Sequence, residues 1–219
     1  DMACWDILGK TTKLPVYQLL GGLINKEVKL FKVISRRDPN EMAKNIESYQ
    51  KQGFKQFQMK VGAKADDDIE RIFKVSERLE KGNILNADAN TGWLQHEAMR
   101  VVKAIRDLDV YIEQPCKSYE ECLSVRKHTD HPFILDECMD SINMLIWGYN
   151  DNAMDVVNLK INRVGGLTKA RQFRDLCITL GIHMTIEVRW GGEIATSAIA
   201  HLAHYTPTAF HFQSSAFNE

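Results

Sequence analysis

The sequence predicts an α/β fold: a (β/α)8-type TIM barrel, in the modified (β/α)7β form that lacks a last helix. Eight short runs rich in β-forming residues recur from residue 28 onward, and amphipathic segments of helical period separate them. This alternation is typical of a parallel sheet with helices outside it. The length of 219 residues fits a lean barrel, since about 250 residues are usual.

The predicted strands are short, mostly apolar runs, each ending in a polar break. They span residues 28–35, 54–62, 83–89, 110–115, 132–137, 155–161, 182–188 and 209–215. Three of the intervening helices are marked clearly. Residues 38–53 have Asp38 as a predicted N-cap and Gly53 as a stop, residues 96–108 carry an apolar stripe, and residues 166–181 end on Gly181.

The main rival to the barrel is a doubly wound open sheet. No G-x-G-x-x-G or G-x-x-x-x-G-K-S/T motif follows the early strands, which removes the commonest reason to prefer that fold. No low-complexity tract or Pro/Gly linker interrupts residues 28–219. We therefore assign residues 28–219 to one barrel domain.

Composition excludes several classes of partner. With 28 Lys and Arg against 29 Asp and Glu, the net charge of −1 gives no reason to expect nucleic acid or an anionic membrane. No apolar run approaches the roughly 20 residues that span a bilayer, and no signal peptide is visible. Five cysteines without a C-x-x-C pair indicate reduced thiols. We expect a cytoplasmic protein.

Charged residues occur at or near the ends of five consecutive predicted strands. They are Lys60, Asp88, Glu113, Asp136 and Lys160, at intervals of 28, 25, 23 and 24 residues. The C-terminal ends of parallel barrel strands meet at one rim, where active sites are built. Strand alternation places these side chains inward and their apolar neighbours outward, and it allows only one of Asp136 and Glu137 to point inward. The pattern predicts an active site at that rim.

Three inward carboxylates on neighbouring strands cannot all ionise side by side without a cation. Asp88, Glu113 and Asp136 supply only oxygen ligands, which favours a hard divalent ion such as Mg²⁺. Lys60 and Lys160 would flank this ion, and a partly desolvated lysine can act as a base. The pattern predicts removal of a proton α to a carboxylate, with the metal stabilising an ene-diolate.

Each of these residues also has a simpler interpretation. A strand-end Asp is often the N-cap of the next helix, Glu113-Gln-Pro could form only a turn, and Lys60 could be a surface lysine with a partly covered stem. The shared spacing and alternation of all five favour the active site. His201 and His204 lack the spacing of a zinc motif and are interpreted as helix surface or packing residues, while His183 begins its strand at the opposite rim.

The motifs at these positions resemble the enolase superfamily, in the mandelate racemase/muconate lactonizing enzyme group. They are "ACWDILGKTTKLPVYQLLGG", "QMKVG", "NADAN", "IEQP", "LDE" and "LKINRVGG". The resemblance implies metal ligation by Asp88, Glu113 and Asp136, with Mg²⁺ as cofactor and Mn²⁺ as a possible substitute. It also implies acid and base roles for Lys60 and Lys160 on opposite faces of the substrate. Residues 1–27 look like the last helices of a truncated N-terminal α+β capping domain.

The Gln-x-Lys version of the second strand and "WGGEIATSAIAHLAH" are similar to enzymes that act on proline derivatives. We expect dehydration of cis-3-hydroxy-L-proline, with Gln58 hydrogen-bonding the substrate carboxylate and Trp190 facing a ring ammonium. Packing of Trp190 beside two glycines is an equal alternative. The open alternatives for the function are a racemase or epimerase of proline or hydroxyproline betaine, and a truncated non-catalytic metal-binding barrel. We also expect a homo-oligomer.

Overall fold

The computed structural model describes residues 1–189 and 191–215. Contacts within the chain divide it into two compact units, which we name by the strands that they contain. The β1–β5 unit comprises Phe31–Cys138 and Gly148–Asp155, and the β6–β8 unit comprises Asp1–Leu30, Met139–Trp147 and Val156–Glu219. Each unit contains parallel strands and helices.

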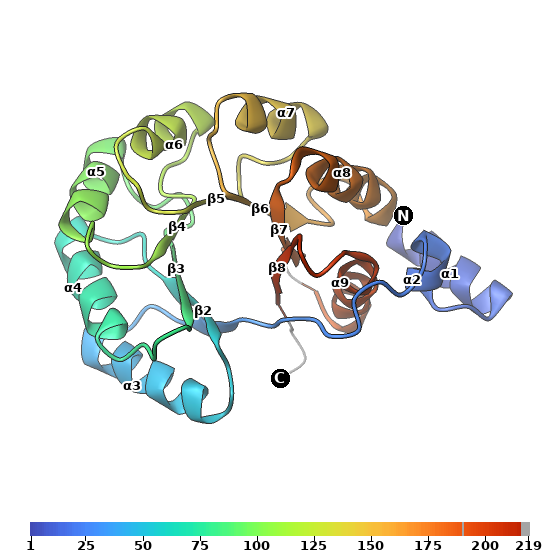
Figure 1. Cartoon of the computed structure of the whole chain (residues 1–219), viewed down its shortest axis with the longest axis horizontal. Coiled ribbons are helices and arrows are strands. Elements are labelled where there is room, and N and C mark those ends of the chain that lie inside the picture. The colour runs from blue at the N-terminus through green and yellow to red at the C-terminus, as the bar shows by residue number, and fades with distance from the viewer. Residues whose placement is uncertain (190, 216–219) are drawn as a thin grey trace. The chain divides into compact units, whose positions relative to one another are not determined.

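The β1–β5 unit contains strands paired in parallel, in chain order. They are β1 (Lys32–Ile34), β2 (Gln56–Lys60), β3 (Ile84–Asp88), β4 (Tyr111–Glu113) and β5 (Phe133–Leu135). The helices between them are α3 (Pro39–Lys51), α4 (Ala65–Ser76), α5 (Gln95–Ala104) and α6 (Tyr119–Arg126). Figure 1 shows these helices following one another along the same side of the strands, as right-handed crossover connections require.

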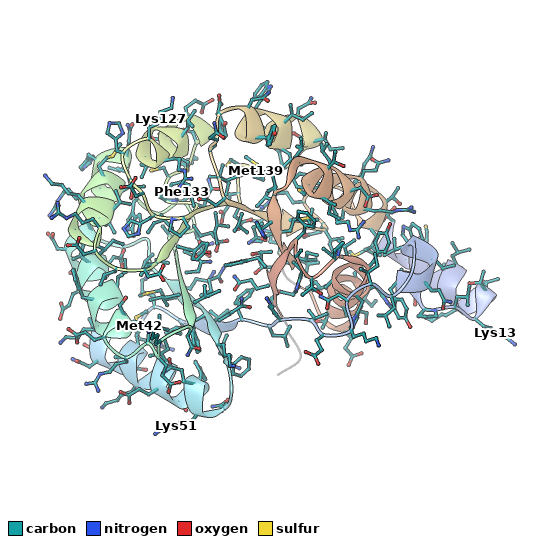
Figure 2. All side chains as sticks on the ribbon, in the orientation of Figure 1. Lys13, Met42, Lys51, Lys127, Phe133 and Met139 are labelled. Carbon is teal, nitrogen blue, oxygen red and sulfur yellow. The ribbon has the colours of Figure 1, made fainter. Side chains whose placement is uncertain are left out.

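The core of this unit lies between the strands and the helices. Met42 and Phe133 are fully buried there. Lys51, at the end of α3, and Lys127, just after α6, are exposed (Figure 2). Helix α3 begins as the sequence predicts: the carboxylate of Asp38 accepts hydrogen bonds from the first-turn backbone at 2.9 and 3.4 Å. The buried residues of this helix are Met42, Ala43 and Ile46.

The β6–β8 unit contains β6 (Val156–Lys160), β7 (His183–Glu187) and β8 (His211–Ser214), again paired in parallel. Its helices are α1 (Met2–Thr12), α2 (Val16–Leu20), α8 (Leu167–Leu180) and α9 (Glu193–Tyr205), and α7 (Ile142–Asn150) runs from this unit into the other. Gly181 ends α8 at a φ of 76°, a left-handed conformation that glycine adopts readily.

The N-terminal helices are attached to the β6–β8 unit by polar contacts. The Asp1 carboxylate accepts hydrogen bonds from the backbone N–H and the hydroxyl of Thr168 at 3.1 and 2.6 Å, so it caps the first turn of α8. The indole N–H of Trp5 donates to the same hydroxyl at 3.0 Å. The backbone N–H groups of Ile24 and Asn25 donate to the carbonyl of His204 at the end of α9.

The strand prediction is confirmed: each of the eight strands in the described part of the chain lies inside one of the eight predicted segments. Within each unit, helices alternate with parallel strands, as the predicted α/β class requires. Across residues 1–189 and 191–215, no helix combines the length and the apolar character that crossing a bilayer demands.

Candidate active site

The predicted site residues of the β1–β5 unit lie side by side at the C-terminal ends of its strands. Lys60 is the register partner of Asp88, and Asp88 is the register partner of Glu113. Side chains at matched positions of a parallel ladder point to the same face. The spacing counted along the sequence therefore corresponds to one row across β2, β3 and β4.

The alternation argument also distinguishes Asp136 from Glu137. Ile134 on β5 is the register partner of Glu113, and Asp136 lies one residue beyond the end of β5, where strict alternation would give it the orientation of Glu113. Asp136 is fully buried, whereas Glu137 is partly exposed and accepts a hydrogen bond from the side chain of Asn90 at 3.1 Å. The choice of Asp136 over Glu137 as a metal ligand stays a prediction.

Lys60 and Asp88 form an ion pair. The Lys60 Nζ atom lies 2.6 Å from Oδ2 of Asp88, and the other carboxylate oxygen accepts from the backbone N–H of Asn90 at 2.8 Å. The Asp88 side chain is 1% exposed and that of Lys60 is 31% exposed. The amine therefore lies at the edge of the row, where solvent or a substrate can reach it, while the carboxylate is enclosed.

Glu113 is held by two amide side chains. Gln58 Nε2 donates to Oε2 of Glu113 at 2.9 Å, and Asn86 Nδ2 donates to the same oxygen. All three residues are buried. A buried carboxylate requires such donors, because its ionised form is otherwise costly away from water. Gln58 lies beside the predicted metal ligands, where its neutral amide adds no second cation next to Lys60.

The chemistry of this donor set fits a hard divalent cation. Asp88, Glu113 and Asp136 offer only oxygen atoms, and each is at most 1% exposed. Among the described residues, no group of three or more His, Cys, Asp or Glu side chains is already arranged to hold a metal ion. In this structure a lysine and two amides bond to the oxygens of Asp88 and Glu113, so metal ligation by these residues stays a prediction.

Gln114 connects the two strands that carry Glu113 and Asp136. Its side-chain oxygen accepts from the backbone N–H of Asp136 at 2.8 Å, and its Nε2 donates to the carbonyl of Cys116 at 3.1 Å. The thiols of Cys122 and Cys138 also contact this amide. Burial raises the pKa of Cys138 to about 12, which favours the protonated thiol at neutral pH.

Lys160, at the end of β6, lies beside a carboxylate that the sequence analysis missed. Glu187 at the end of β7 is the register partner of Lys160, and their charged atoms are 3.7 Å apart. The side chain of Asn158 donates to the same carboxylate at 3.3 Å. Glu187 follows Lys160 by 27 residues, which is one more strand-to-strand interval. Extending the count by one strand would have identified it.

The histidine interpretations are confirmed. His201 on α9 accepts a hydrogen bond from the backbone N–H of Tyr17 at 3.3 Å, and His204 contacts the carbonyl of Asn25 at 2.7 Å. Both rings therefore attach α9 to the N-terminal segment. His183 is the first residue of β7, at the opposite end of the strand from the rim. Trp190 lies outside the described residues.

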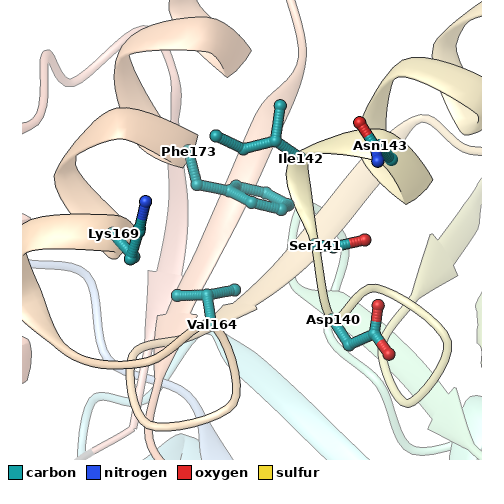
Figure 3. Close-up of a pocket in the computed structure, with 7 residues that line it drawn as sticks. All are labelled: Asp140, Ser141, Ile142, Asn143, Val164, Lys169 and Phe173. Atoms are coloured by element: carbon teal, nitrogen blue, oxygen red, sulfur yellow. The ribbon is translucent and has the colours of Figure 1, made fainter.

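A cavity of about 260 Å³ lies elsewhere in the β6–β8 unit, between the first turn of α7 and α8. Figure 3 shows Phe173 and Ile142 close together along one side of it, with Lys169 and Asp140 at its edges. None of the predicted site residues is among the residues that line this cavity. We assign it no part in the chemistry.

Comparisons with known proteins identify the family and support the fold. Residues 41–219 match the family model described as "Enolase C-terminal domain-like". The chain is 56% identical over 218 residues to the cis-3-hydroxy-L-proline dehydratase of Roseibium aggregatum, covering 100% of this chain and 59% of that protein. It is 31% identical over 207 residues to the N-succinyl-L-Arg/Lys racemase of Bacillus cereus, covering 93% of this chain and 56% of that protein.

Solved structures of enolase superfamily members are also similar to this chain. A mandelate racemase/muconate lactonizing enzyme from Roseovarius nubinhibens matches with a TM-score of 0.92 and 42% identity, over 97% of this chain and 59% of that one. An enolase superfamily member from the same organism, complexed with magnesium, matches with a TM-score of 0.90 and 36% identity, over 98% and 58%. The TIM-barrel fold class is thereby confirmed. The chain spans less than two thirds of the length of these relatives.

Proposed function

We propose that the protein removes the α-proton of a carboxylate substrate and dehydrates cis-3-hydroxy-L-proline. The premise is that this chain belongs to the enolase C-terminal domain-like family of the enolase superfamily. The main support is the 56% identity to a dehydratase of that substrate over the whole chain. The row of Lys60, Asp88 and Glu113 at one set of strand ends supports the same chemistry.

The stereochemistry of the substrate suits two basic residues. In cis-3-hydroxy-L-proline the hydroxyl and the carboxylate share one face of the ring, so the α-hydrogen lies on the face opposite the hydroxyl. One lysine removes the α-proton, and the other donates a proton to the departing hydroxyl. The Cα–H and C3–O bonds break, a C=C bond forms and water leaves. In the proposal, Lys60 and Lys160 face opposite sides of the ring.

Mg²⁺ is the proposed cofactor, and Asp88, Glu113 and Asp136 would hold it. When bound, the ion stabilises the negative charge that proton removal places on the substrate carboxylate. The protein contributes three enclosed carboxylates and the amides that orient one of them, Gln58 and Asn86. Orientation of ligands by neighbouring donors is a common means of tuning metal affinity.

Two further residues are proposed to bind the substrate. Gln58, whose amide donates to Glu113, would also hydrogen-bond the substrate carboxylate. Trp190 would face the ring ammonium through a cation–π contact, a proposal that rests on the sequence. Glu187, the last residue of β7, lies three residues before Trp190 in the sequence and would add negative charge near a ring ammonium.

Epimerisation is the second candidate, and the racemase among the relatives favours it. Both reactions begin with the same proton removal, and ¹H NMR in D₂O distinguishes them. With cis-3-hydroxy-L-proline and Mg²⁺, a dehydratase breaks the C3–O bond and releases water. An epimerase instead gives a product that carries deuterium at Cα and retains the hydroxyl. Lys60→Ala and Lys160→Ala should each abolish dehydration. Absence of any Mg²⁺-dependent reaction at Cα of proline, hydroxyproline or their betaines would support the non-catalytic alternative.

Two statements about organisation are also proposals. Residues 1–27 would be the last helices of a capping domain, which is supported by the greater length of the relatives. The protein would form a homo-oligomer. Its molar mass in solution, measured by light scattering coupled to size-exclusion chromatography, tests this. A monomeric mass across micromolar concentrations would refute it.

A further inference from the structure

Asp68, on α4, is a fully buried carboxylate that the proposed reaction does not use. Its Oδ2 atom accepts hydrogen bonds from the backbone N–H groups of Gly62 at 2.9 Å and Ala63 at 2.6 Å, and from the indole N–H of Trp93 at 2.9 Å. Its Oδ1 atom accepts from the guanidinium of Arg71 at 2.8 Å. Four donors on one enclosed carboxylate make a rigid, fully satisfied arrangement.

These donors come from the loops that follow two site residues. Gly62 and Ala63 lie two and three residues after Lys60, and Trp93 lies five residues after Asp88. Asp68 therefore connects the loop after β2 to the loop after β3. The backbone N–H of Trp93 continues the connection, because it donates to the carbonyl of Pro115 in the loop after β4 at 3.2 Å.

The two loops are also in close contact. Gly62 has a φ of +89°, and a Cβ atom added there would lie 2.1 Å from the carbonyl oxygen of Ala89. A Cβ atom added at Gly92 would lie 2.4 Å from the carbonyl oxygen of Gly62. Only glycine permits this approach at both positions. Asp68 therefore binds the loop after β2 where its backbone is tightly packed against the backbone of the loop after β3.

We propose that Asp68 is a positioning residue for Lys60, fixing through Gly62 and Ala63 the end of β2 that carries the amine. Trp93 would transmit this anchoring to the strand end that carries Asp88. The proposal rests on the proposed function, in which Lys60 exchanges a proton with one face of the substrate. A displacement of about 1 Å is enough to reduce proton transfer substantially.

The test measures the exchange of the α-proton of L-proline and D-proline with D₂O by ¹H NMR, in the presence of Mg²⁺. Proline has no hydroxyl to lose, so exchange reports proton removal alone. Lys60→Ala and Lys160→Ala first establish which enantiomer depends on which lysine. The ratio of the two exchange rates then reports the placement of Lys60, because a general loss of structure lowers both rates together.

Asp68→Asn is the principal variant, and Asp66→Asn is its control, since Asp66 lies on the same helix and is paired with Arg100 at the surface. We expect Asp68→Asn to slow exchange of the Lys60-dependent enantiomer at least tenfold and of the other less than threefold. Binding of Mn²⁺, followed by electron paramagnetic resonance, should change less than threefold. Asp66→Asn should leave the ratio unchanged.

Trp93→Phe is a milder variant in case Asp68→Asn does not fold, because it removes one donor and leaves three on the carboxylate. It should lower the same ratio by about threefold, while Trp147→Phe, at an exposed tryptophan on α7, should not. Equal slowing of both enantiomers, or an unchanged ratio in a folded variant, would overturn the inference alone. A wild type that neither exchanges proline nor dehydrates cis-3-hydroxy-L-proline would refute the proposed function, and the inference with it.

Discussion

His211 on β8 makes the stability of the β6–β8 unit depend on pH. The ring is 2% exposed, and Nε2 lies 2.9 Å from the hydroxyl of Ser214. Burial, together with the positive charges of Lys29 and His204, lowers the pKa of His211 from 6.5 to about 4. The folded protein therefore holds this ring neutral over a range in which the unfolded chain binds a proton.

The size and sign of the effect follow from this difference. One pKa unit corresponds to about 1.4 kcal/mol, so a fall from 6.5 to about 4 corresponds to about 3 kcal/mol. Because the unfolded state binds more protons between these pH values, the unfolding free energy decreases as the pH falls. The contribution of His211 is complete above about pH 6.5 and is lost as the pH approaches 4.

The assay is urea unfolding, followed by tryptophan fluorescence, of the wild type and of His211→Gln across this pH range. The variant lacks the titrating ring, so its unfolding free energy should fall by about 3 kcal/mol less than that of the wild type between pH 7 and pH 4. His183→Gln, at an exposed position on β7, is the control for loss of a histidine. Parallel pH profiles for the wild type and His211→Gln would refute the reasoning.

The cap, the turns and the metal site each give a further expectation. Asp38→Ala removes the first-turn acceptor of α3 and should lower the urea unfolding free energy by about 1 kcal/mol; no loss would contradict a capping role. Gly53→Ala and Gly62→Ala both place alanine at positive φ, but a methyl group at residue 53 meets open space. We expect a cost of about 1–2 kcal/mol at residue 53. The cost at residue 62, where the methyl group clashes with Ala89, should be at least twice as large, and equal costs would contradict the clash. Chelation by EDTA should abolish α-proton exchange and Mg²⁺ should restore it, while Asp136→Asn should weaken Mn²⁺ binding at least tenfold; exchange that survives EDTA would refute the metal role.

The strand positions and the row of charged residues were predictable because both follow from periodicity. A spacing of one strand–helix unit selects equivalent strand ends, and alternation then selects side chains of one face, as the register of Lys60, Asp88 and Glu113 shows. Asp38 and Gly181 were identified because helix ends require specific residue types.

The hydrogen-bonding partners were not predictable in the same way. Asp68 reads as an ordinary first-turn acid of α4, since the donors that surround it come from residues up to 25 positions away. Asn86 shares a face with Asp88 and is the register partner of Tyr111, so only the side-chain positions in the structure show that its amide reaches Glu113. Glu187 was missed for a different reason, because the count of strand ends stopped at Lys160.

The matched positions of Lys60, Asp88 and Glu113 have an evolutionary consequence. Each functional group belongs to a separate strand, and the backbone ladder that aligns the strands does not depend on which side chain each one ends with. A single codon change can therefore exchange one group while its neighbours keep their places. Selection can adapt such a rim to a new reactant in small steps, without first having to redesign the architecture beneath it.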